Sequence, residues 1–305
     1  MSDDLSIVLT AGLVATACGL LGPFLILRRQ ALLSDAVSHA VLPGIVLVFV
    51  LFGSRAPLAA IGGAALFAVV CVLGIEALRA TGLLKADAAI ALVFPVLFAI
   101  GVIGIGSFAS GAHLDLDATI YGEIAFAPFR TWELLGVEVA RSIPLLGAVA
   151  LANAVLLTLL WKELKVTTFD PEFSRVSGFS PALVSRLLLV AVAVTAVTAF
   201  ESVGAILVVT MLIVPAATAY LLVGRLPALI AATLAVGWVS AIGGHATAVA
   251  LDASIAGAMG LVATGCFVAA LLLSPRYGLL AVAARRARAR RAIARRLGDP
   301  AAAPR

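Results

Sequence analysis

Charged side chains are scarce in this 305-residue sequence. Asp, Glu, Lys and Arg together make up 12% of it, whereas a soluble domain typically contains about 25%. Hydrophobic residues make up 63%, and the mean hydropathy is +1.18. So few charges cannot provide the polar shell of a water-soluble globule. The composition therefore excludes a soluble fold and predicts an integral membrane protein.

The common signatures of thiolate metal centres and hydrolytic enzymes are also missing. Cys18, Cys71 and Cys266 lie in separate apolar runs without CxxC spacing, which argues against a thiolate metal cluster or a disulfide framework. The sequence has no GxxxxGK[ST] phosphate loop, no HExxH helix and no GxSxG serine elbow. We predict that the chain is not an enzyme and does not hydrolyse ATP itself.

Long apolar runs dominate instead, and a bilayer is crossed by about 20 such residues in a helix. The sixth and seventh runs are separated by little more than Glu201 and Ser202, so one of the nine runs can be short, broken or re-entrant. We predict an all-α, polytopic membrane protein with eight or nine transmembrane helices. The runs are 5–27, 32–52, 57–78, 88–109, 142–161, 182–200, 203–223, 226–250 and 254–273.

Positive charges indicate the orientation in the membrane. The breaks that contain Arg28, Lys165 and Arg225, and the arginine-rich tail, fall on one side of a nine-span topology. Lys and Arg are enriched in cytoplasmic loops, so this side is predicted to be the cytoplasm and the N-terminus lies outside. We divide the chain into a membrane domain, 1–280, and a basic cytoplasmic tail, 281–305, which favours anionic lipid over nucleic acid.

The longest polar interruption, residues 111–141, falls on the external side. It mixes carboxylates such as Glu123 and Glu133 with apolar residues such as Trp132. This composition is consistent with one or two surface helices. We expect the segment to offer a docking face.

One pair of ionisable side chains, Asp35 and His39, falls inside an apolar run, near the start of its helix. Their i, i+4 spacing puts both on one face of a helix. An ionisable group near the bilayer centre costs about 2.5–3.5 kcal/mol and by default marks a functional pathway. A carboxylate and an imidazole together suit a divalent transition metal. For an isolated pair, a local Asp–His hydrogen bond is the simpler interpretation.

Two other residues are further candidates for the pathway. His245 follows two glycines in the eighth run, although a lone histidine is more often a packed polar residue. Glu201 lies at the break between the sixth and seventh runs. We assign neither a specific ligand role.

A compact helix signal lies on the predicted cytoplasmic side, at residues 170–178. Asp170 suits a helix N-cap, Pro171 suits the first helical position, and Gly178 suits the residue after the end. A short helix held between two spans can transmit force to a partner. An ordinary ordered loop fits these residues equally well.

Six local motifs lie in or beside the apolar runs: 21–29 (LGPFLILRR), 34–44 (SDAVSHAVLPG), 169–173 (FDPEF), 203–207 (VGAIL), 213–219 (IVPAATA) and 273–278 (LSPRYG). With these motifs the sequence resembles the zinc/manganese/iron ABC permease family, over nearly the whole chain except the arginine tail and parts of 127–142. The resemblance implies a type II ABC importer-like permease fold, with a metal site at Asp35 and His39. It also implies a coupling helix that contacts an ATPase, and its residues here are Asp170, Pro171, Glu172, Phe173, Arg175 and Gly178.

The same resemblance implies the function and the partners. It implies the membrane-spanning permease subunit of an ATP-driven importer of zinc, manganese or iron, in the inner (cytoplasmic) membrane. The expected partners are ABC ATPase subunits, an extracytoplasmic metal-binding protein and a second permease in a homodimer. The metal ion is the transported substrate, and no permanently bound cofactor is expected. The alternative is an ion-coupled secondary metal transporter, which works without an ATPase.

Overall fold

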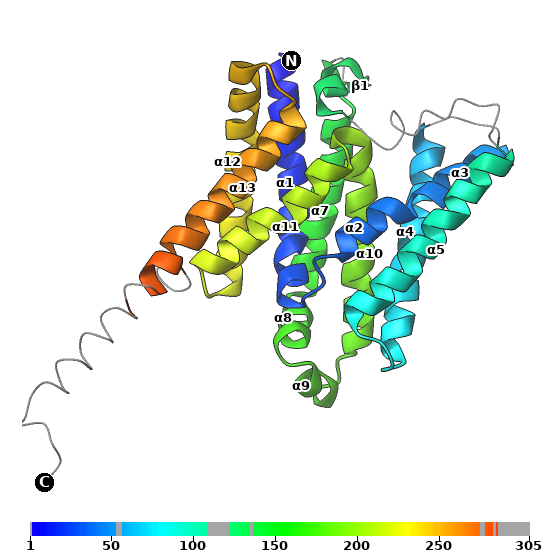
Figure 1. Cartoon of the computed structure of the whole chain (residues 1–305), viewed down its shortest axis with the longest axis vertical. Helices are drawn as coiled ribbons and strands as arrows, with labels where there is room; N and C mark the ends of the chain where they lie inside the picture. The colour runs from blue at the N-terminus through cyan, green and yellow to red at the C-terminus, as the bar shows by residue number, and fades with distance from the viewer. Residues whose placement is uncertain are drawn as a thin grey trace, which may run out of the picture.

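The computed structural model describes residues 2–52, 57–108, 123–134, 137–274, 278–282 and 285. These residues form a bundle of long helices with one 3₁₀ helix, η1 (Ile124–Phe129), and one hairpin of strands β1 (Thr131–Leu134) and β2 (Val137–Ala140) (Figure 1). The helices are α1 (Asp3–Leu27), α2 (Leu33–Ala40), α3 (Leu42–Phe52), α4 (Pro57–Ala80), α5 (Ala86–Phe108), α7 (Ser142–Leu159), α8 (Trp161–Phe169), α9 (Pro171–Val176), α10 (Pro181–Val203), α11 (Ala205–Leu222), α12 (Leu226–Leu251) and α13 (Ile255–Leu273).

Nine segments of the described chain are long and apolar enough to cross a membrane, with α2 and α3 together forming the second. The predicted all-α, polytopic architecture is confirmed, and the choice between eight and nine spans falls on nine for the described ranges. The N-terminus and the hairpin lie at one end of the bundle, and α8 and α9 lie at the other (Figure 1). This placement agrees with the predicted topology, in which the N-terminus and residues 111–141 lie on one side of the membrane and the break that contains Lys165 lies on the other.

Helix α1 is the centre of one group of helices and packs against α7, α10, α11 and α12. Small residues make these contacts close: a Cβ atom at Gly12 would overlap the ring of Trp238, and one at Gly22 would overlap the backbone of Leu212. Lipid tails are as apolar as the helices, so close packing of small residues supplies much of the attraction between spans. The small residues of α1 thus allow one helix to contact four others.

Polar side chains also join α1 to its neighbours. The amide of Asn153 on α7 donates to the carbonyl of Ala17 (3.1 Å) and to the hydroxyl of Thr195 on α10 (2.8 Å). The hydroxyls of Thr10 and Ser142 lie 2.8 Å apart in a second buried bond. Away from water these donors and acceptors must be satisfied inside the protein, so the bonds hold α1, α7 and α10 together.

Helices α3, α4 and α5 form a second group, which Figure 1 shows on the far side of α10 from α1. They pack on one another, and α10 packs on α4. The short helix α2 lies between the two groups and contacts α4, α5 and α10. The segment that contains Asp35 and His39 is therefore placed where the two groups of helices meet.

The run predicted at residues 32–52 is divided into two helices rather than one. Helix α2 ends at Ala40, and Val41 is a turn before α3 begins at Leu42. Pro43 explains the break, because proline has no N–H and its ring crowds the preceding turn. The N–H groups of Gly44 and Ile45 both bond to the Val41 carbonyl, at 3.1 and 3.2 Å. The break therefore ends α2 one residue after His39.

We expect Gly63→Ala to destabilise the protein, because a Cβ atom at Gly63 would overlap the Gly44 carbonyl where α3 crosses α4. Overpacking of this kind costs about 1–3 kcal/mol. Gly62→Ala is the matched control: no atom lies within 4 Å of a Cβ there, and alanine is a better helix former by about 1 kcal/mol. Thermal unfolding in detergent should show a lower midpoint for Gly63→Ala and an equal or higher one for Gly62→Ala. Equal midpoints for the two variants would contradict this close crossing.

The break between the sixth and seventh runs, predicted around Glu201, lies at Gly204 in the structure. Helix α10 continues through Glu201 to Val203, and the single residue Gly204 separates it from α11. Gly204 has φ +84° and ψ 156°, a backbone conformation essentially restricted to glycine. Glu201 is therefore in the last turn of a helix rather than in a connection.

The described part of residues 111–141 differs from the expected surface helices. It contains η1 and an antiparallel hairpin in which Trp132 pairs with Val139. Aromatic and β-branched residues such as Thr131, Trp132 and Val139 favour strands, which accounts for the hairpin. Residues 111–122 and 135–136 lie outside the described part.

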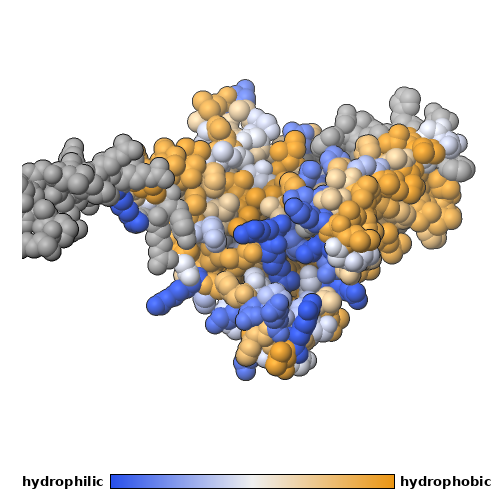
Figure 2. Space-filling model, turned by 60° about the horizontal axis from the view of Figure 1, so that its bottom comes forward, coloured by the Kyte–Doolittle hydropathy of each residue, from blue (hydrophilic) through white to orange (hydrophobic). Residues whose placement is uncertain are grey.

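The end that includes α8 and α9 has a hydrophilic band between apolar surfaces when it is turned forward in Figure 2. Lys162, Lys165 and Arg175 are exposed on these two helices. Apolar flanks suit contact with lipid, and exposed cations suit the cytoplasmic side. The predicted basic tail, 281–305, lies outside the described residues except for positions 281, 282 and 285.

Candidate functional site

Asp35 and His39 lie on one face of α2 as predicted. His39 Nε2 is 3.9 Å from Asp35 Oδ1, and the two side chains are 49% and 58% exposed, respectively. A separation of 3.9 Å is too long for a hydrogen bond. A tetrahedral metal with bonds of about 2.0–2.1 Å holds its nitrogen and oxygen ligands about 3.3 Å apart. Small side-chain rotations would thus let one ion bridge the two groups.

Two phenylalanines of α5 hold the imidazole of His39. Its ring stacks on Phe94, with centroids 5.8 Å apart, and meets Phe98 edge-on at 5.7 Å. Phe94 and Phe98 are one helical turn apart, so both project from one face of α5 toward α2. Sequence reasoning missed them, although their i, i+4 spacing in the fourth predicted run was a usable signal.

The Asp35–His39 pair offers two metal ligands from one chain. Among the described residues, no three His, Cys, Asp or Glu side chains come together as a metal-binding group. The pair is also half-exposed in the segment that α2 and α3 form together, which is long and apolar enough to cross a membrane, where contact of ionisable groups with lipid is costly. The geometry therefore favours a surface that another chain covers.

His245, a further pathway candidate, pairs with the N-terminal segment. Its Nε2 lies 3.2 Å from Asp4 Oδ1. The histidine is largely buried, and its Nδ1 has no hydrogen-bond partner within the described structure. The contact joins α12 to the start of α1 at the external end.

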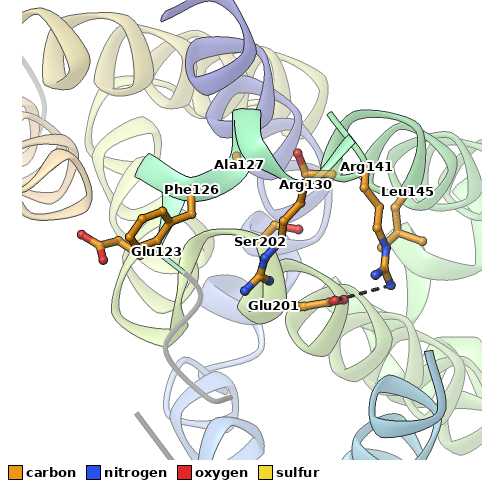
Figure 3. A pocket seen from close by; sticks show the side chains of 9 residues that line it. Glu123, Phe126, Ala127, Arg130, Arg141, Leu145, Glu201 and Ser202 are labelled. Atoms are coloured by element: carbon orange, nitrogen blue, oxygen red, sulfur yellow. Dashed lines mark ion pairs between the residues drawn. The ribbon is translucent and has the colours of Figure 1, made fainter. Parts of the chain in front are cut away.

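Glu201, the other pathway candidate, faces a depression of about 380 Å³ that is partly open to solvent. Arg141 Nη2 lies 3.4 Å from Glu201 Oε1, and the Arg141 guanidinium also sits 5.2 Å from the centre of the Trp132 ring. Figure 3 shows Arg130 and Arg141 directed toward Glu201. The carboxylate thus has a cationic partner that sequence reasoning missed. The depression is lined by Glu123, Phe126, Ala127, Arg130, Arg141, Ser142, Leu145, Glu201 and Ser202.

The short helix predicted at residues 170–178 is present as α9. Asp170 Oδ1 accepts a hydrogen bond from the Phe173 N–H at 2.9 Å, and Pro171 occupies the first turn. Gly178 has φ +85° after the helix end, and its N–H bonds to the Arg175 carbonyl at 3.2 Å. These are the capping interactions expected of an N-cap aspartate and a C-terminal glycine.

Helix α9 exposes apolar side chains at the end of the bundle. Phe173 is 58% exposed and Val176 is 87% exposed. Figure 1 shows α9 beyond the ends of the long helices, next to α8. Exposed apolar residues on a protruding polar end are typical of a protein interface.

Arg28, which follows α1, contacts the end of α8. Its Nε donates to the Thr168 hydroxyl at 3.1 Å and its Nη2 donates to the Thr167 hydroxyl at 2.9 Å. Burial lowers the pKa of the Arg28 guanidinium to about 10; the Glu76 carboxylate opposes this shift and Arg79 adds to it. The side chain therefore stays charged at neutral pH. Sequence reasoning used Arg28 only as an orientation signal and missed these contacts.

Residues 5–274 match the model of the ABC 3 transport family. The chain belongs to this family. It is 39% identical to the manganese transport system membrane protein MntD of Bacillus subtilis, over 92% of this chain and 95% of that protein. It is 40% identical to the zinc transport system membrane protein TroD of Treponema pallidum, over 90% of this chain and 75% of that protein.

Solved structures agree with this family assignment. PsaBC from Streptococcus pneumoniae, determined in complex with Fab, superimposes with a TM-score of 0.73 and 28% identity, covering 91% of this chain and 94% of that one. An inward-facing transporter assigned to the metal-chelate type of ABC transporters has a TM-score of 0.63 at 17% identity, covering 88% of this chain and 85% of that one, a likeness in fold alone. The predicted family is confirmed, and the chain is a multi-pass permease subunit with ATP hydrolysis on a separate subunit.

Proposed function

We propose that this chain is the membrane-spanning permease subunit of an ATP-driven importer of divalent metal ions, namely zinc, manganese or iron. The Asp35–His39 pair on α2 is the observation that carries the proposal, because it places a carboxylate and an imidazole within reach of one ion inside a membrane span. The names of the relatives, which are manganese, zinc and chelated-iron transport proteins, support the same substrates. The protein resides in the inner (cytoplasmic) membrane.

The metal ion enters from the external side and is held transiently at Asp35 and His39. The carboxylate offers charge, and the neutral imidazole offers a nitrogen ligand. Phe94 and Phe98 fix the imidazole plane, so little ordering is needed when the ion arrives. With only two protein ligands from one chain, the ion is held loosely enough to be passed on.

A second permease completes the pathway, as a homodimer or a related pair. The exposed face that contains Asp35 and His39 needs a cover that is not lipid, since lipid would leave both groups without polar partners. A facing copy would contribute its own carboxylate and imidazole. Four ligands around one ion is the number that zinc usually takes.

Helix α9 is the contact with the ATPase. Glu172, Phe173 and Arg175 are exposed on the cytoplasmic end, and the caps at Asp170 and Gly178 make the helix rigid. A rigid, exposed helix with apolar side chains fits a groove on a partner. We infer that ATP-driven closure of two ATPase subunits moves α9 and switches the pathway between its external and internal openings.

The external partner is a metal-binding protein that docks on the side of η1 and the hairpin. This side has exposed Phe126 and Phe129 next to the charged depression around Glu201. Aromatic and charged residues of this kind are common in protein interfaces. Residues 1–280 form the permease domain in this proposal, and 281–305 form a basic tail at the cytoplasmic membrane surface.

Reconstitution tests the proposal against an ion-coupled secondary transporter. We expect proteoliposomes with the permease, its ATPase and the external binding protein to accumulate a divalent metal only when ATP reaches the ATPase. The permease alone should accumulate none under an imposed ion gradient, because its own chain has no energy-coupling partner there. Gradient-driven uptake by the permease alone would establish the secondary transporter instead. Elemental analysis of zinc, manganese and iron in a deletion strain would identify the substrate.

A further inference from the structure

The cytoplasmic end of α1 is joined to the base of α9 through one side chain. Arg28 donates from Nε to Thr168 and from Nη2 to Thr167, and both threonines belong to the last turn of α8. Asp170, which follows α8 directly, is the N-cap of α9. Only the last turn of α8 therefore lies between α9 and the Arg28 contacts, so a displacement of α9 can move Arg28. The two bonds are charge-assisted, and such bonds are stronger than neutral ones.

The same arginine begins the short connection to the metal-binding helix. Arg29 has φ +56°, the left-handed conformation that glycine usually adopts after a helix. Its N–H bonds to the Ile26 carbonyl at 3.1 Å, and the Gln30 N–H bonds to the Leu25 carbonyl at 2.9 Å. These bonds form a closed C-terminal motif. The connection between Arg28 and α2 is thus hydrogen-bonded and defined, rather than slack.

Two further observations show that the connection between Arg28 and α2 is held in one conformation. A non-glycine residue in the left-handed region is strained and persists only where its surroundings determine it. Gln30 is buried and its N–H bond continues the motif, while the Leu33 N–H bonds to the Gln30 carbonyl at 3.1 Å. Helix α2 begins at Leu33. Asp35, in its first turn, is therefore only seven positions after Arg28, and backbone bonds at Arg29, Gln30 and Leu33 order the segment between them.

We propose that Arg28 is a positioning residue that transmits movement of α9 to α2 and so to Asp35 and His39. This inference rests on the proposed function, in which α9 contacts the ATPase and the Asp35–His39 pair holds the metal. Without the Arg28 contact, movement of α9 reaches α2 only through α10, which follows α9 and packs on α2, so α2 follows the ATPase less closely. ATP hydrolysis would then continue without a matching transport of metal.

The chemistry of the contact requires a guanidinium. Nε and Nη2 are two donors in one rigid plane, and they reach two hydroxyls on successive residues. Lysine has the same charge but a single compact head group, so it does not reproduce a fork of two bonds. The positive charge next to the last turn of α8 also favours that helix end, and Arg28→Lys retains this effect. A comparison of wild type with Arg28→Lys thus distinguishes the effect of the two planar donors from the effect of the positive charge.

The test uses the full complex of permease, ATPase and external binding protein in proteoliposomes, with metal uptake and ATP hydrolysis measured together. We expect Arg28→Lys and the double variant Thr167→Val/Thr168→Val to retain ATPase association and hydrolysis within about twofold, and to lower metal moved per ATP by about tenfold, the scale on which residues between coupled sites act. Lys85→Gln is the control, since it removes an exposed cation from the connection between α4 and α5 and leaves the Arg28 contacts and the connection to α2 intact. It should leave metal per ATP unchanged.

The outcomes are distinct. Unchanged metal per ATP in both Arg28→Lys and the threonine double variant would overturn the inference. It would also be overturned if the variants lowered only the amount of folded protein and left metal per ATP unchanged. As a second measurement, spin labels on α9 and α2 should show that nucleotide moves α9 equally in wild type and Arg28→Lys but moves α2 less in Arg28→Lys. Equal movement of α2 in the two proteins would also overturn the inference. A wild-type complex without ATP-driven uptake would instead overturn the proposed function, so the two failures are seen in different samples.

Discussion

Replacing Asp35 or His39 with alanine is expected to abolish metal uptake while the ATPase still associates with the permease. Each substitution removes one of the two proposed metal ligands on α2, and changes even in the outer shell of a metal site lower affinity by about 10–100-fold. Loss of a ligand itself should cost at least as much. Uptake of radioactive or isotopically enriched metal into cells measures the effect, and co-purification of the ATPase measures association.

The substitutions at Asp35 and His39 are not expected to damage the fold. Both side chains are about half exposed in the isolated subunit, and their mutual separation of 3.9 Å leaves no strong bond to lose. Asp87→Asn is a matched control, because Asp87 is an exposed carboxylate at the start of the adjacent α5. Normal uptake in both alanine variants would remove the pair from the pathway. A loss of uptake in Asp87→Asn as large as in Asp35→Ala would show that negative charge alone matters.

The membrane-spanning helices could be predicted from sequence because the bilayer leaves few alternatives. Backbone groups in lipid must bond within the segment, so each apolar run of sufficient length becomes a helix. Local signals were equally reliable at α9, where Asp170, Pro171 and Gly178 act on neighbouring backbone groups within a few residues. Pro43 is a local signal for a break in the second run, but only the structure places that break at Val41.

Features that depend on distant residues could not be predicted in this way. Arg28 is 140 positions from Thr168, and Asn153 is 136 positions from Ala17. No local pattern encodes such partners, because each depends on how whole helices pack. The Arg141–Glu201 ion pair is of the same kind.

The candidate metal site was only partly predictable for the same reason. The i, i+4 spacing of Asp35 and His39 is a local property, and the structure places both side chains on one face of α2. The positions of Phe94 and Phe98 around the imidazole required the packing of α5 on α2. Short strands such as Thr131–Leu134 were likewise hidden, because four residues give little alternation to recognise.

The strongest expected effect at the cytoplasmic end comes from Phe173→Ala. Phe173 is 58% exposed in the subunit, and burial of a phenylalanine side chain at an interface contributes about 1.5–3 kcal/mol. Its loss should weaken binding of the ATPase by about 10–100-fold, with a matching loss of ATP-driven uptake at limiting ATPase concentration. Titration of the purified ATPase onto the permease in nanodiscs measures the affinity.

Helix α9 itself should survive the Phe173→Ala change. The capping bond from the residue-173 N–H to Asp170 involves the backbone, and alanine favours helix more than phenylalanine does. Phe129→Ala is the matched control, since Phe129 is 75% exposed at the other end of the bundle and should leave ATPase affinity unchanged. An unchanged affinity in Phe173→Ala would place the ATPase on another surface. An equal loss in both variants would instead indicate a general defect in packing, because the two side chains lie at opposite ends of the bundle.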